Sequence, residues 1–228
     1  MHFGVGLSLA ALFWLYVALR VQALGFSVSA LLLGWLAVST AWVAVGYLGL
    51  GVGVFGKDSR GGRAWWAYLL AGPYMFCVQR TRGLIHRFSS ERDWDEVSPG
   101  VYVGRIVPRE ALPADVCTVV DLTAEFREDP AILASLRYHC LPTLDGCAPS
   151  HAQLARLVGA LVSEPQPIYV HCAAGHGRSA LCAAVLLHRL GRGVRVRDIE
   201  REMRRVRARI HLTRTQARCA RAALDLEP

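Results

Sequence analysis

The sequence predicts an α/β fold, a central sheet flanked by helices, preceded by an α-helical transmembrane hairpin. Three observations predict it. Residues 1–56 are strongly apolar and contain one charged residue, Arg20. From Val97 onward, short apolar runs alternate with amphipathic ones, the pattern of a sheet covered by helices. Between residues 168 and 190, an apolar strand meets a helical run through a glycine-rich turn. We therefore predict a hairpin over 1–56, a basic and aromatic segment over 57–94, and an α/β domain over 95–228.

Two uncharged runs make up the predicted hairpin. The first extends from Phe3 to Leu19, and the second, from Phe26 to Phe55, is long enough to cross a bilayer with some tilt. Glycines and alanines in the second run favour close helix packing. The alternative is a cleaved signal peptide, for which 21–23 resembles a cleavage site. No lysine or arginine precedes the first run, however, and a second span follows at once, so we favour the hairpin.

The segment after the hairpin indicates which side of the membrane the α/β domain occupies. Basic residues cluster at Lys57, Arg60 and Arg63, whereas the loop between the two runs has only Arg20. The positive-inside rule therefore places the α/β domain in the cytoplasm. Residues 64–78 are aromatic but short and interrupted by Gly72-Pro73, which favours a segment lying in the membrane interface. The alternative is a short third span, which would place the N-terminus outside. We expect residues 79–95 to be a linker.

The α/β domain is predicted from alternating elements and their capping residues. Four strands are expected, at Val101–Val103, Cys117–Leu122, Arg137–Leu141 and Ile168–Cys172. Four helices are expected, the first and last opened by capping boxes, at 150–162, 180–190, 196–209 and 213 onward. The third of these is strongly basic, and we expect its arginines from Arg201 to Arg209 to form a solvated face, with contact to a membrane or to substrate as the alternative. Short strands with helices between them predict the central sheet.

The glycine-rich turn has the features of a phosphate-binding loop. Such a turn aims successive backbone N–H groups, and the positive end of a helix, at one spot. Two glycines allow a tight bend, and Arg178 can hold two phosphate oxygens with its planar fork. A Walker-type nucleotide loop is excluded because no Gly-Lys-Ser/Thr follows the turn. The turn reads His171-Cys172-Ala173-Ala174-Gly175-His176-Gly177-Arg178-Ser179.

Cys172 is the candidate nucleophile of this turn. A free thiol, with a pKa of about 8.5, is mostly protonated at neutral pH. A helix N-terminus and a neighbouring arginine can lower a cysteine pKa to roughly 3.5–7.5, so that the thiolate predominates. Ser179 is placed to donate a hydrogen bond to the sulfur when it leaves. We expect no metal and no cofactor, because the loop supplies the charge stabilisation that a metal would give.

This turn resembles the active-site signature of the cysteine-dependent protein tyrosine phosphatase superfamily, which is His-Cys, five residues, Arg, then Ser or Thr. Within that superfamily the chain is most similar to the small dual-specificity phosphatases, over about Asp95 to Leu226. The resemblance implies a hydrolase acting on phosphomonoesters through a phosphocysteine intermediate. It also implies that the loop holds the substrate phosphate, through His171, Ala173, Ala174, Gly175, His176, Gly177 and Arg178.

Asp145 is the candidate general acid. The leaving oxygen needs a proton, which a carboxylic acid on a mobile loop usually supplies. Asp145 lies in a glycine- and proline-punctuated loop after a predicted strand, and the loop resembles the acid loop of the phosphatases of regenerating liver. Asp121, at the end of a buried strand, is the rival, and we interpret it as a structural hydrogen-bonding group. His171 is expected to fix the cysteine loop, and His176 to line the mouth of the pocket.

The net charge and the cysteine content narrow the kinds of partner and of stabilising site that we expect. The net charge is +8, and of the 26 basic residues only Lys57 is a lysine. A basic chain with an apolar front suits an anionic membrane surface, whereas basic residues without interleaved aromatics do not favour nucleic acid. Seven cysteines without a CxxC pair argue against a disulfide framework or a zinc site.

The sequence leaves the substrate open. Neutral residues at 173, 174 and 177 favour phosphotyrosine or phosphoserine/threonine proteins, because lipid phosphatases of this superfamily often carry extra basic residues inside the loop. The membrane segment instead favours a lipid phosphate, such as a phosphoinositide or phosphatidylglycerophosphate. A non-catalytic phosphate-binding membrane adaptor is the alternative of a different class. Because Cys172, Arg178 and Asp145 are all present, we favour the enzyme.

Overall fold

The computed structural model describes residues 2–226, which form two compact units. The first unit consists of the described part of Met1–Lys57 together with Gly62–Ser90. The second consists of Asp58–Gly61 together with the described part of Glu91–Pro228. The first unit exposes many of its large apolar side chains, whereas the second buries most of them in two cores.

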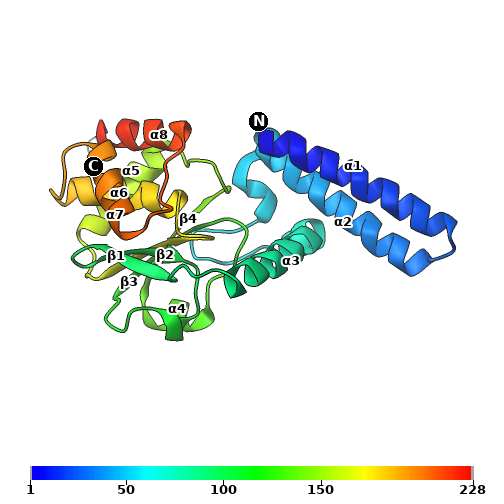
Figure 1. The fold of residues 1–228 in the computed structure, drawn as a ribbon, viewed down its shortest axis with the longest axis horizontal. Helices are drawn as coiled ribbons and strands as arrows, with labels where there is room; N and C mark the ends of the chain where they lie inside the picture. The colour runs from blue at the N-terminus through cyan, green and yellow to red at the C-terminus, as the bar shows by residue number, and fades with distance from the viewer. Residues whose placement is uncertain (1, 227–228) are drawn as a thin grey trace. The chain divides into compact units, whose positions relative to one another are not determined.

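A helical hairpin forms most of the first unit. Helices α1 (His2–Ala23) and α2 (Ser27–Val45) pack along one another and are joined by a short turn (Figure 1). Their large apolar side chains point outward, as at Leu12 and Leu31, which are 62% and 74% exposed. The residues that α2 buries are mostly small, which allows close backbone approach. Among the described residues, Phe3–Ala23 and Ser27–Phe55 are long and apolar enough to cross a bilayer.

The second apolar run is not one regular α-helix. The α-helix ends at Val45 and is followed by a π-helical turn, η1 (Gly46–Leu50), and a 3₁₀ turn, η2 (Gly51–Phe55). Glycines at 46, 49, 51 and 53 explain the change, because glycine is among the poorest helix formers.

Residues 64–87 differ most from the expectation. A single helix, α3 (Trp65–Arg87), runs through Pro73 and includes most of the predicted linker. Proline at 73 removes the hydrogen bond that the carbonyl of Leu69 would accept, and such a loss usually breaks a helix. Here the indole of Trp35 donates to that carbonyl at 2.7 Å, and the hydroxyl of Ser39 accepts from the N–H of Tyr74 at 3.1 Å. Side chains of α2 therefore satisfy the groups that the proline disturbs.

A mixed sheet organises the second unit. Within the described residues its order is β1-β2-β5-β3-β4, with β1 antiparallel to β2 and the other pairs parallel. The four predicted strands are confirmed. Strand β1 was not predicted, because its Trp-Asp-Glu-Val-Ser sequence lacks an apolar run and lies at the edge of the sheet. The strands are β1 (Trp94–Ser98), β2 (Val101–Arg105), β3 (Thr118–Thr123), β4 (Arg137–Thr143) and β5 (Ile168–Cys172).

Helices cover both faces of this sheet (Figure 1). Alternate residues of β3 and β5 divide between two cores, with Val120 and Val170 facing the larger one and Val119 and Tyr169 the smaller one. This arrangement confirms the predicted α/β fold. Helices α5 (His151–Val162), α6 (Arg178–Arg189), α7 (Val196–Val206) and α8 (Arg214–Leu224) close the larger core, and the smaller core is closed by α4 (Pro130–Ser135) and the segment 107–116, which includes the turn η3 (Arg109–Ala111).

The helix ends agree with the sequence prediction at two capping boxes and differ from it at the end of α7. Both predicted capping boxes are present, with Ser150 accepting from Gln153 and Thr213 from Gln216. Helix α7 ends at Val206 and not at Arg209 as predicted, so Arg207 lies outside the helix.

Candidate active site

The predicted phosphate loop joins β5 to α6 at the carboxyl end of the parallel strands, where α/β folds place their sites. Strand β5 ends at Cys172 and helix α6 begins at Arg178. Gly175 has φ +77°, and a Cβ on it would lie 2.5 Å from the carbonyl carbon of Gly104 in β2. The loop is therefore pressed against the backbone of β2, and a side chain at position 175 would not fit.

The sulfur of Cys172 is buried within this loop. The N–H of Gly175 donates to it at 3.3 Å, and the hydroxyl of Ser179 lies 3.4 Å away. Burial by itself would raise the pKa of the Cys172 thiol, but the charge of Arg178 and the hydrogen bonds from Ser179 and Gly175 outweigh it, so that the pKa is lowered. The environment thus favours the nucleophilic thiolate.

Arg178 is held in place by a carboxylate that the sequence analysis did not single out. Its two terminal nitrogens contact the two oxygens of Glu125, at 3.0 Å from Nη1 and 2.7 Å from Nη2. Nη1 also donates to the carbonyl oxygen of Thr143 at 2.7 Å. Burial alone would lower the pKa of Arg178, but the carboxylate of Glu125 raises it, and the guanidinium stays charged. Among the described residues, its buried Nε–H has no acceptor, so a donor remains for a ligand oxygen.

Asp145, the candidate acid, lies beside this arginine. It follows β4, its side chain is 65% exposed, and its Oδ1 is 2.9 Å from Nη2 of Arg178. The N–H of Gly146 also donates to Oδ1, at 3.0 Å. The structure therefore brings Asp145 to the guanidinium that faces Cys172, although its role as an acid remains a prediction.

Asp121, the rival carboxylate, is completely buried. It accepts hydrogen bonds from the N–H and hydroxyl of Thr123, both at 2.7 Å, and from the hydroxyl of Tyr138 at 2.8 Å. Burial and the nearby Asp121 raise the pKa of Tyr138, which keeps its phenol protonated as a donor. These bonds fit the structural interpretation of Asp121.

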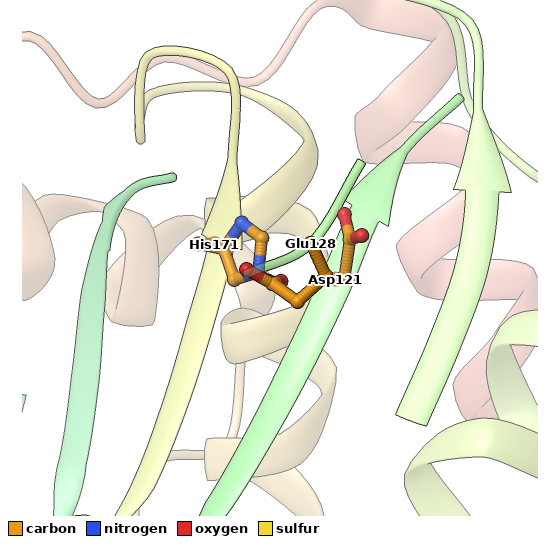
Figure 2. A group of neighbouring side chains, drawn as sticks. All are labelled: Asp121, Glu128 and His171. Atoms are coloured by element: carbon orange, nitrogen blue, oxygen red, sulfur yellow. Dashed lines mark hydrogen bonds and ion pairs between the residues drawn. The ribbon is translucent and has the colours of Figure 1, made fainter. Parts of the chain in front are cut away.

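His171 does not line the loop with its side chain. The imidazole is 1% exposed, and its Nε2 lies 2.7 Å from Oε2 of the buried Glu128. Figure 2 shows this pair with Asp121 on the neighbouring strand, and one side-chain oxygen or nitrogen from each of the three lies within 4.8 Å of the other two. Any contact of His171 with a substrate would therefore involve its backbone and not its ring.

His176 has a partner at the outer side of the loop. Its Nε2 lies 2.8 and 3.0 Å from the two oxygens of Glu91. Burial lowers the pKa of His176, and the charges of Arg207 and Arg209 add to this effect, while Glu91 opposes it.

Four residues at the site were not predicted. Glu125 and Glu128 lie in the segment that follows β3, and a signal for them existed, because acidic residues there lie at the same sheet edge as the loop. No comparable signal marks Glu91. The expectation of a solvated face is wrong for Arg207, which is 2% exposed and contacts the loop.

Residues 106–223, just over half of the chain, match the family model described as Swiss Army Knife protein, DSP-PTPase phosphatase domain. No curated protein sequence gives a significant match.

Solved structures with a similar fold include a mutant form of Tk-PTP, with 24% identity, a TM-score of 0.50, and coverage of 58% of this chain and 95% of that one. PTPMT1 in complex with PI(5)P has 19% identity, a TM-score of 0.49, and coverage of 58% and 95%. Human DUSP28 has 16% identity, a TM-score of 0.49, and coverage of 59% and 95%.

Proposed function

Because the chain belongs to the Swiss Army Knife family of DSP-PTPase phosphatase domains, we propose that it is a membrane-anchored, cysteine-dependent phosphatase that forms a phosphocysteine on Cys172. One observation carries this proposal. The Cys172 sulfur is buried beside Ser179 in the first turn of α6, accepts the N–H of Gly175, and has a lowered pKa beside Arg178. A thiolate beside a guanidinium with an open donor suits attack on a phosphate dianion.

The reaction has two steps. In the first, the Cys172 thiolate attacks phosphorus, the bond from phosphorus to the ester oxygen breaks, and Asp145 gives that oxygen a proton. In the second, Asp145 takes a proton from water, the water oxygen bonds to phosphorus, and the thiolate leaves with the hydroxyl of Ser179 as its hydrogen-bond donor. The products are the alcohol or phenol and inorganic phosphate. The guanidinium and the loop amides hold the phosphoryl oxygens throughout.

We favour phosphotyrosine and phosphoserine/threonine proteins as substrates. The loop positions Ala173, Ala174 and Gly177 carry no charge, and the single titratable side chain among the intervening residues, His176, already pairs with Glu91. The loop thus offers little extra positive charge for a polyphosphorylated headgroup. A lipid phosphate is the second candidate, because two helices of the chain are apolar enough to lie in a bilayer.

The substrate class can be tested directly. Phosphopeptides and lipid phosphates would be compared by kcat/KM, with the full chain in micelles. We expect phosphopeptides to be hydrolysed faster. A higher kcat/KM for phosphoinositides or phosphatidylglycerophosphate would reverse this assignment without affecting the cysteine mechanism.

The mechanism itself is tested with Cys172→Ser. This variant should lose turnover of an aryl phosphate and still bind a phosphate analogue, because the loop and Arg178 remain. Trapping of radiolabelled phosphoenzyme in the wild type, and its absence in the variant, would identify the intermediate. Significant turnover by the serine variant would contradict the proposal, and binding without turnover in the wild type would identify an adaptor.

The membrane part of the proposal places both termini in the cytoplasm. Helices α1 and α2 would cross the bilayer, and α3, with exposed Phe76, Leu84 and Ile85 beside arginines, would lie in the interface. The basic cluster after the second span supports this orientation. Reporter fusions at the two ends would test it, and an N-terminus found outside would mean that α3 crosses the membrane.

A further inference from the structure

Arg207 contacts the outer side of the phosphate loop. It follows the end of α7, and its side chain is buried. Its Nε donates to the carbonyl oxygen of Gly175 at 2.9 Å, and its Nη2 donates to the carbonyl oxygen of Ala174 at 3.1 Å. One guanidinium therefore binds two successive peptide groups of the loop.

These two bonds bear on how the loop binds phosphate. When a loop turns its N–H groups toward a ligand, the carbonyls of the same peptide planes face the opposite way. Buried carbonyls need donors, and a peptide plane whose carbonyl is fixed has a fixed N–H as well. The N–H of Gly175, which donates to Cys172, belongs to the plane whose carbonyl is that of Ala174. Arg207 thus fixes the direction of an amide at the reacting sulfur.

The other edge of the guanidinium is held by residues Glu91–Asp95, which we call the strap. Nη1 donates to Oδ2 of Asp95 and to the carbonyl oxygen of Arg92, both at 3.0 Å. Nη2 lies 3.3 Å from Oε1 of Glu91, the same carboxylate that contacts His176. The strap supplies two carboxylates, so the buried charge of Arg207 is compensated.

We propose that Arg207 is a positioning residue for phosphate binding, and that the strap holds Arg207 in the orientation that keeps the loop amides aimed at the ligand. Ser90, the last residue of the first unit, is followed directly by Glu91. The polypeptide leaving the helical unit is thus the segment that holds the guanidinium. This inference rests on the proposed function, because its readouts are phosphate binding and phosphatase turnover.

The decisive variant is Arg207→Lys. It keeps the positive charge between Asp95 and Glu91, but a single ammonium group lacks the planar fork that reaches two carbonyls and a carboxylate together. Misplacement of a reacting group by about 1 Å can cost roughly 10²-fold. We therefore expect the variant to weaken binding of inorganic phosphate about 10-fold or more and to lower kcat/KM by roughly 10–10²-fold. The dependence of rate on the leaving group should be unchanged, because Asp145 is untouched.

Arg205→Lys is the matched control. Arg205 is 70% exposed and pairs with Glu202 within α7, away from the strap, so its replacement should leave phosphate affinity unchanged. Binding would be measured by calorimetry and turnover with an aryl phosphate, using the full chain in micelles, with a thermal melt of each variant. An Arg207→Lys variant that binds phosphate as tightly as the wild type would overturn the inference.

A second variant keeps the test decisive if Arg207→Lys does not fold. Asp95→Asn leaves the guanidinium and the loop intact but removes one anchoring charge. It should weaken phosphate binding as well, and unchanged affinity in this folded variant would likewise reject the role of the strap. If the wild type neither binds inorganic phosphate nor hydrolyses the aryl phosphate, the proposed function fails, whereas an active wild type with indifferent variants rejects the inference alone.

Discussion

The two faces of the phosphate loop, residues 172–178, are built in opposite ways. On the inner face, Arg178 is oriented by Glu125 while its Nε–H has no acceptor among the described residues. On the outer face, the carbonyls of Ala174 and Gly175 are bonded to Arg207. In the proposed function, this difference would let a short loop bind a dianion, because donors stay available on one side while the carbonyls on the other side are fixed. Catalysis depends on such preorganised donors, which need little rearrangement when charge develops.

The largest effect on the inner face should come from Arg178→Lys. An ammonium group cannot contact both oxygens of Glu125 in this planar arrangement and also donate a hydrogen bond to phosphate, as the Nε–H of Arg178 can. We expect kcat/KM for an aryl phosphate to fall by roughly 10³-fold or more, in the range found for arginines that stabilise phosphoryl transfer. A loss of less than 10-fold in kcat/KM would mean that phosphate binding on the inner face does not depend on the planar guanidinium of Arg178. The thermal melt should be recorded as well, because breaking a buried pair also destabilises the fold.

The next effect should come from Asp145→Asn. If Asp145 protonates the leaving oxygen, phenyl and alkyl phosphates should slow by roughly 10²–10⁴-fold, the usual range for general-acid catalysis. Activated aryl phosphates, which leave without a proton, should lose much less. Single-turnover rates across a leaving-group series would measure this, and equal losses for every leaving group would reject the assignment.

Asp121→Asn provides the contrast to that series. Asp121 is buried and accepts from Thr123 and Tyr138, so its replacement should lower stability and slow all substrates alike. A leaving-group dependence in this variant would move Asp121 to the position of the acid.

The smallest effect should be a change in pH dependence with Ser179→Ala. The thiolate is the reactive form, so kcat/KM should rise with pH through the pKa of Cys172, which lies below its ordinary value. Removing the hydroxyl of Ser179 takes away one of the interactions that lower this pKa, and the acid limb of the profile should move to higher pH. The kcat/KM value would be reduced mainly at low pH and would approach that of the wild type at alkaline pH. An unmoved acid limb would show that Ser179 does not stabilise the thiolate.

The inner face could be predicted from the sequence because its parts are contiguous. Cys172, Arg178 and Ser179 share one strand–turn–helix segment, so local spacing suffices to place them. Glu125 and Arg207 reach the same loop from distant elements. The place of Glu125 after a predicted strand indicates its sheet edge, but its pairing with Arg178 depends on the strand order β2-β5-β3. The position of Arg207 depends on where α7 ends. An arginine among many on a basic amphipathic helix resembles its solvated neighbours until the fold buries it.

The same reasoning explains the fold. The apolar strands and the two capping boxes follow from local chemistry and were predicted. The edge strand β1 and the continuous helix α3 were not, because both depend on partners elsewhere in the chain. In α3 the carbonyl left free by Pro73 is bonded by Trp35, a residue of another helix.

The contact between Gly104 and Gly175 has a consequence for recognising relatives. A Cβ on Gly175 would lie 2.7 Å from the carbonyl oxygen of Gly104, and a Cβ on Gly104 would lie 2.8 Å from the carbonyl oxygen of Asp93. A methyl group at Gly175 would meet the backbone of β2, whereas one at Gly104 would meet the side chains of Tyr169 and Trp94 as well as the backbone of Asp93, so each position needs glycine for its own reason. In a divergent sequence, a Cys-x₅-Arg motif alone occurs by chance. A glycine at the position of Gly175 within the motif would indicate that the loop lies against the neighbouring strand as it does here.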